Sequence, residues 1–168
     1  MNLLTVYRVL SFLLLPVAAL FAMLLLPGIV IGLANPAFLL NAFLLASVVI
    51  YTYCTFRFLI RGIDGKKKCK PVLKDWIRIN SFISILFAVE TIAPISLVLN
   101  PQRFQEVLMQ AYAQYPKQLQ DMWSIAQLQK VMEGLLIFFF IYGIVLLIHI
   151  FISRFYIRKY AYLFEETE

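Results

Sequence analysis

The sequence contains little of what catalytic and metal sites require. Its 168 residues include one histidine, two cysteines and nine acidic side chains. The single histidine, His149, excludes a haem held by two histidines of one chain. Cys54 and Cys69 do not form a Cys-x-x-Cys pair, which argues against a thiol redox relay. Phosphate-binding glycine loops, nucleophile elbows and zinc-binding helix motifs are also missing. We therefore expect a protein that is not an enzyme and that binds neither a cofactor nor a metal.

Apolar residues are abundant instead. They make up 62% of the chain, and the mean hydropathy is +0.85, whereas soluble domains are roughly 45–50% apolar. Four apolar segments, at about 9–33, 37–60, 77–99 and 132–153, reach the ~20 residues that a helix needs to cross a bilayer. Spans of this length satisfy their backbone hydrogen bonds only as helices. The first run exceeds the ~7–15 residues of a signal-peptide core, so it is expected to be retained. The sequence predicts one all-α integral membrane domain over residues 1–168.

A short pattern occurs twice in the same order. Arg-x-x-Ser-Phe stands at residues 8–12 and 78–82, Asn-Pro at 35–36 and 100–101, and Arg-Phe-x-Ile-Arg at 57–61 and 154–158. Basic residues thus mark the start and end of each half, and Asn-Pro marks its turn. The pattern predicts two transmembrane hairpins of the same orientation, arising either by duplication of an ancestral hairpin or by convergence.

The basic residues predict the orientation of the spans. Twelve of the fifteen lysines and arginines lie near the start, between residues 57 and 78, or in the tail. The positive-inside rule places the loop 61–76, the tail 154–168 and both termini in the cytoplasm. We expect the protein to lie in a bacterial inner membrane. We expect no nucleic-acid binding, because no basic domain accompanies the lysine run at residues 66–70. The predicted contacts to anionic headgroups are Lys66, Lys67, Lys68, Lys70, Arg154, Arg158 and Lys159.

The segment 100–131 is predicted to lie outside as a short amphipathic helical insert between the third and fourth spans. Five apolar or aromatic residues fall on one helical face: Phe104, Val107, Leu108, Ala111 and Tyr115. Asn100-Pro101 opens this helix, and Tyr115-Pro116 ends it. A second short pattern contains Leu119, Met122, Trp123 and Ala126. The segment is either a lid or partner-docking surface, or an amphipathic pair lying among the headgroups; we favour the second.

Glu90 is the main candidate for a polar site inside the membrane, because it falls near the middle of the third span. A charge at that depth costs roughly 2.5–3.5 kcal/mol on insertion scales. Pro94 cannot donate a hydrogen bond to the carbonyl of Glu90, so the helix is expected to bend there. The candidate site consists of Glu90 and five neighbours in sequence or in expected depth, Thr91, Pro94, Ser47, Tyr51 and Tyr142. His149 is expected to be packed or interfacial, on the order of 10 Å from Glu90 along the membrane normal.

Two classes of function remain open. The first is a non-enzymatic membrane protein that acts structurally or by docking a membrane-protein partner or a second copy of itself. The alternative is a small transporter or channel subunit that uses Glu90 as a proton or cation site. Glu90 itself is also open to two interpretations: an ion site, or a neutral acid that holds helices together.

Overall fold

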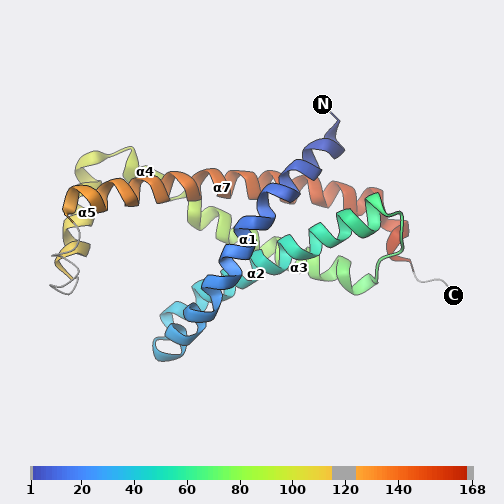
Figure 1. The fold of residues 1–168 in the computed structure, drawn as a ribbon, viewed down its shortest axis with the longest axis horizontal. Helices are drawn as coiled ribbons and strands as arrows, with labels where there is room; N and C mark the ends of the chain where they lie inside the picture. Colours follow the sequence, from blue (N-terminus) through green and yellow to red (C-terminus); the bar gives the residue numbers. More distant parts are fainter. Residues whose placement is uncertain (1, 115–123, 166–168) are drawn as a thin grey trace. The chain divides into compact units, whose positions relative to one another are not determined.

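The computed structural model describes residues 2–114 and 124–165. Every element in these ranges is helical (Figure 1). Four helical segments are long and apolar enough to cross a membrane, namely Leu3–Ala34, Phe38–Asp64, Pro71–Val98 and Ile125–Lys159. The predicted class, an all-helical protein with four candidate spans, is thereby confirmed.

The chain divides into two compact units. The first unit comprises Met1–Ala88 and Val145–Glu168, and the second comprises Val89–Ile144. Two long helices, α3 and α7, contribute residues to both units. The residues discussed below as a polar cluster and as basic cavities all belong to the first unit.

Helices α1 (Leu3–Ala34) and α2 (Ala37–Arg57) pack against each other in the first unit and are joined through Asn35 and Pro36. Gly32 does not end α1 in a left-handed conformation, because no described glycine has a positive φ. It lies inside the helix, where a Cβ atom would come within 2.7 Å of Leu39 Cδ2. A glycine at this position therefore allows close approach of the two helices and does not form the turn.

The basic end of α2 continues as a wider helix. A π-helix, η1 (Phe58–Asp64), follows α2 directly, and the Gly65 amide donates to the Ile60 carbonyl, 3.0 Å away and five residues back. This π-helical turn was not predicted and begins before the expected loop. The non-helical connection is therefore shorter than expected, because helix α3 starts at Pro71, a residue whose fixed φ suits the first helical position.

The third span is interrupted where the sequence predicted a bend. Helix α3 (Pro71–Ile92) ends two residues before Pro94, and a short helix, α4 (Ile95–Val98), follows. The Ala93 amide still reaches the Val89 carbonyl at 3.0 Å, but Pro94 has no amide hydrogen to continue the series.

The insert contains helix α5 (Pro101–Ala113). The Asn100 side chain caps it by accepting from the Arg103 amide at 3.3 Å, and Pro101 is its first residue. On the predicted apolar face, Phe104 and Leu108 are buried, whereas Val107 is exposed. The predicted stop at Tyr115-Pro116 lies outside the described residues, as do Leu119, Met122 and Trp123 of the second pattern. Ala126, the last residue of that pattern, belongs to the following long helix.

Helix α7 (Ile125–Lys159) begins earlier than the sequence predicted, because Ser124 and Gln127 form a capping box. The Gln127 amide donates to Ser124 Oγ at 3.3 Å, and the Ser124 amide donates to Gln127 Oε1 at 3.0 Å. A short 3-10 helix, η2 (Ala161–Phe164), follows α7.

Ring contacts join the helices of the first unit. Phe12 and Phe21 of α1 contact Phe56 of α2 and Phe87 of α3, respectively. Phe58 of η1 stacks on Phe164 of η2.

Candidate functional site

The most fully connected polar group in the first unit is His149 of α7, which is completely buried. Its Nε2 lies 2.9 Å from Ser11 Oγ on α1, and its Nδ1 lies 2.9 Å from the Tyr51 hydroxyl on α2. Both ring nitrogens are therefore bonded to hydroxyl groups of different helices. We call His149, Ser11, Tyr51, Tyr7 and Ser153 the histidine cluster.

Tyr7 closes one side of the histidine cluster. Its ring stacks on the imidazole of His149, with 5.0 Å between centroids and 12° between planes. Its hydroxyl lies 3.2 Å from Ser153 Oγ, one turn beyond His149 on α7. Tyr7 and Ser11 share the buried face of α1 because they are four residues apart. The same spacing places His149 and Ser153 on one face of α7.

The hydrogen bonds determine which nitrogen of His149 carries the proton. Ser11 Oγ donates its only hydrogen to the Tyr7 carbonyl oxygen, 2.8 Å away. It must therefore accept at its other contact, so we assign the hydrogen to His149 Nε2. The groups in contact with the ring are hydroxyls and tyrosine rings, and a buried cation without a carboxylate would be costly. A neutral ring leaves the lone pair at Nδ1, where it accepts from the Tyr51 hydroxyl.

This assignment decides what the cluster can do chemically. A serine beside a histidine suggests an activated nucleophile, which requires the imidazole to accept the serine proton. Here the imidazole donates to Ser11, and its lone pair is directed at Tyr51. Ser11 is only 1% exposed and His149 is 0% exposed, so a substrate carbonyl cannot reach either atom. The cluster joins α1, α2 and α7 by hydrogen bonds and contains no free base.

The six residues predicted as a site around Glu90 are divided between the two units. Ser47 and Tyr51 belong to the first unit, and the other four belong to the second. The Ser47 hydroxyl donates to the Phe43 carbonyl at 3.0 Å, within its own helix. The Tyr51 hydroxyl bonds to His149, as described above.

Glu90 and its sequence neighbours lie at the interruption of the third span. Glu90 is exposed, and Thr91 and Pro94 follow it where α3 ends. Tyr142, on α7, is buried and stacks on Phe138, with ring centroids 6.3 Å apart.

Sequence reasoning missed the histidine cluster. It predicted only that His149 is packed or interfacial, and it did not include Tyr7, which is fully buried, among the candidate site residues. One signal was available. Ser11 belongs to the repeated Arg-x-x-Ser-Phe motif, and it is the only hydroxyl residue within the predicted first span. Its partner could not be read from the sequence, because Ser11 and His149 are 138 positions apart.

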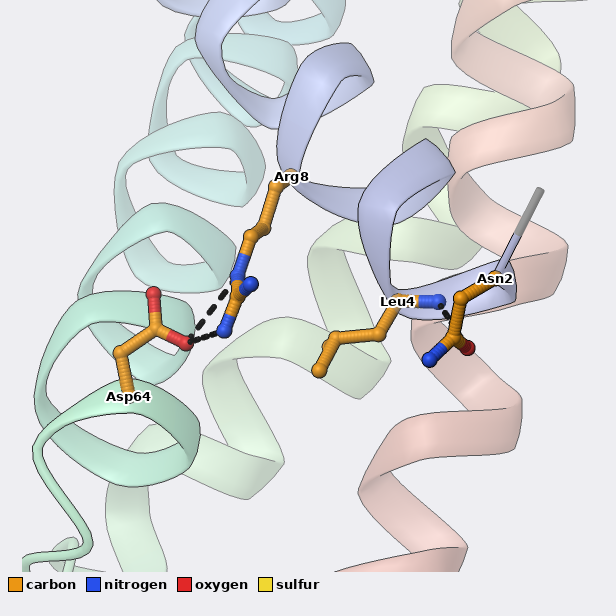
Figure 2. Close-up of polar contacts among 4 residues, drawn as sticks. All are labelled: Asn2, Leu4, Arg8 and Asp64. Carbon is orange, nitrogen blue, oxygen red and sulfur yellow. Dashed lines mark hydrogen bonds and ion pairs between the residues drawn. The ribbon is translucent and has the colours of Figure 1, made fainter.

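Three basic regions meet at one end of the first unit. Arg8 of α1 forms an ion pair with Asp64 of η1, whose Oδ1 lies 3.2 Å from Nε and 2.5 Å from Nη2 (Figure 2). The Cys69 amide, in the loop between η1 and α3, donates to the Leu163 carbonyl of η2 at 2.8 Å. The N-terminal helix, the basic loop and the segment after α7 are thus connected. All seven predicted headgroup contacts are exposed at this end.

Two cavities open between the helices at this basic end. A crevice of about 450 Å³ lies between α2, η1 and α3, with apolar walls and a rim of Arg57, Arg61, Lys68 and Lys70. Cys69 lies in the same crevice, and burial raises the pKa of its thiol, although the Arg61 and Arg57 guanidinium groups partly oppose the shift. A second cavity, of about 530 Å³, lies between α3 and the end of α7 and has a more polar lining.

Comparison of the chain with protein-family models, curated proteins and solved structures finds no match.

Proposed function

We propose that this is a non-enzymatic, multi-pass protein of a bacterial inner membrane, which acts by binding at the membrane rather than by a reaction of its own. One observation carries the proposal: both ring nitrogens of His149 are hydrogen-bonded to buried hydroxyl groups, Nε2 to Ser11 and Nδ1 to Tyr51. The best-placed nucleophile and base are thereby occupied with holding three helices together. What the protein binds is anionic lipid at its basic end and, within the bilayer, a membrane-protein partner or a second copy of the chain.

The proposed topology is two hairpins of the same orientation, with both termini and the loop 61–76 in the cytoplasm and residues 100–131 outside. Its support is the density of lysine and arginine, which favours the cytoplasmic side. The Arg8–Asp64 ion pair and the Cys69–Leu163 hydrogen bond add further support, because they gather the basic regions at one end of the first unit.

A covalent probe tests the non-enzymatic part of this proposal. The purified full chain in lipid nanodiscs is treated with a fluorophosphonate, which reacts with serines that a neighbouring base has activated. We expect no labelling of Ser11 by mass spectrometry, in the wild type or in the His149→Gln variant. Labelling of Ser11 in the wild type that disappears in His149→Gln would show an active nucleophile and overturn the proposal.

The alternative function is transport of protons or small cations through Glu90. The interruption of the third span at Ile92 favours it, because broken helices are common at transporter binding sites. Proteoliposome flux of protons and sodium, compared between wild type and Glu90→Gln, separates the two functions. Our leading proposal expects no flux above empty liposomes in either protein. Uptake that Glu90→Gln abolishes would establish the alternative.

A further inference from the structure

We propose that the cavity between α3 and the end of α7 is a specific site for the phosphate group of an anionic phospholipid. Lys74 and Arg78 of α3 and Arg154 and Arg158 of α7 line the cavity, which encloses about 530 Å³. Its remaining lining residues are Ser81, Ile157 and Ala161. Four cationic side chains thus surround one space, and no acidic residue of the described part of the chain lines it.

The cavity is preorganised by Ser81, which is buried. Its hydroxyl donates to the Arg78 carbonyl at 2.8 Å, and Arg154 Nη2 donates to Ser81 Oγ at 3.5 Å. Ser81 thereby holds the guanidinium group of Arg154 on the side of α3. Arginine offers paired N–H groups whose geometry matches phosphate oxygens. Three of the four cationic residues that line the cavity are arginines.

The two halves of the sequence differ in how this charge is balanced. Arg8 and Arg78 both open an Arg-x-x-Ser-Phe motif. Arg8 is paired with Asp64 within the chain. Arg78 faces Arg154 and Arg158 across the cavity, and none of the three forms an ion pair among residues 2–114 and 124–165. Like charges held together in this way favour an anion from outside the chain.

The surroundings favour a lipid over free phosphate. Ile79, Phe82 and Phe155 flank the cationic residues in sequence and are each at least half exposed. They lie near the basic ends of two candidate spans, where the headgroup layer meets the acyl chains. Basic pockets between transmembrane helices on the cytoplasmic side are known to bind lipid headgroups. A phospholipid whose phosphate group lies in the cavity would place its acyl chains along these apolar side chains.

This lipid site rests on the proposed binding of anionic lipid. Native mass spectrometry of the full chain in detergent tests the site separately from topology and catalysis. The chain is titrated with cardiolipin, phosphatidylglycerol and phosphatidylethanolamine, and separately with inorganic phosphate. We expect cardiolipin or phosphatidylglycerol to be retained in preference to phosphatidylethanolamine. The double variant Arg78→Gln/Arg154→Gln should weaken this binding about tenfold or more.

The matched control is Arg103→Gln/Lys130→Gln, which removes the same charge from exposed positions that line neither cavity and are not among the predicted headgroup contacts. It should change the affinity less than about twofold if the cavity is specific. Equal loss in both double variants would mean general surface attraction and would overturn the site. Loss in Arg57→Gln/Arg61→Gln alone would move the site to the other crevice and would also overturn it, as would retention of inorganic phosphate without any lipid. If the cavity variant unfolds, Arg78→Lys/Arg154→Lys keeps the charge, and it should still weaken binding because the paired N–H geometry is lost.

Discussion

Ser11 Oγ and His149 Nε2 lie 2.9 Å apart in the buried interior of the first unit, and we assign the imidazole as the donor of their hydrogen bond. The direction follows from Ser11, which donates its only proton to the Tyr7 carbonyl. We therefore propose a structural role for these two residues, whose types are found in catalytic pairs. Their bond joins the first helix of the chain to the last span, α7.

Removing the Ser11 hydroxyl should destabilise the protein. Ser11→Ala leaves the Nε2–H group of His149 buried without an acceptor, and we expect a loss of about 1–2 kcal/mol of unfolding free energy. Ser84 provides the control, because it is equally buried but its hydroxyl has no partner among the described residues. Ser84→Ala should be neutral or slightly stabilising. Denaturant unfolding in detergent micelles measures both, and equal losses would contradict the structural role of Ser11.

The close approach of α1 and α2 predicts that substitutions at two glycines of α1 affect stability differently. Gly32→Val should lower the melting temperature, because its Cβ would come within 2.7 Å of Leu39 Cδ2. Gly28→Ala is the control: nothing lies within 4 Å of a Cβ there. It should be neutral or raise stability by up to about 1 kcal/mol through helix propensity. Thermal unfolding of the two variants in one detergent compares them, and a stable Gly32→Val protein would refute this packing.

Cys69 should react slowly with thiol reagents at neutral pH. Its thiol is buried and its pKa is raised, so less thiolate is present at any pH below that pKa. In a Cys54→Ala background, maleimide labelling should increase as the pH rises, and it should reach its midpoint at a higher pH than an exposed thiol does. A Lys67→Cys variant lacking both native cysteines supplies that exposed thiol. Equal rates at neutral pH would show that Cys69 is accessible.

The proposed topology predicts that the loop at Gly65 and the end of α5 lie on opposite sides of the membrane. A reporter active only in the cytoplasm should be active when inserted at Gly65 and inactive at Gln114. A reporter active only outside should give the reverse pattern. The same side for both positions would contradict the four-span topology.

The sequence was sufficient for features that depend on local chemistry. Apolar length predicted the four spans, Asn100-Pro101 predicted the start of α5, and Pro94 predicted the interruption of the third span. Each of these depends on backbone geometry or on burial over a few turns. Gly32 shows the limit, because the sequence alone does not reveal that a Cβ atom at this position would approach Leu39 on the next helix.

The histidine cluster could not be predicted because it depends on tertiary contacts. His149 approaches Ser11 and Tyr51 only after α1, α2 and α7 pack together. An inward-facing polar residue and an exposed one look alike in a sequence whose long spanning helices are apolar on all sides. Glu90 stood out by its charge and expected depth, whereas His149 gains its hydrogen bonds from residues 98 and 138 positions away.

The protonation of His149 tests the central claim, that its Ser–His pair holds helices together and performs no reaction. The chain has one histidine, so nitrogen NMR of protein labelled with ¹⁵N-histidine in lipid bilayers observes this ring alone. We predict a neutral imidazole at pH 7, with the hydrogen on Nε2 and a lone pair on Nδ1. A hydrogen on Nδ1 and a lone pair on Nε2 would make His149 a base directed at Ser11, and would contradict the account.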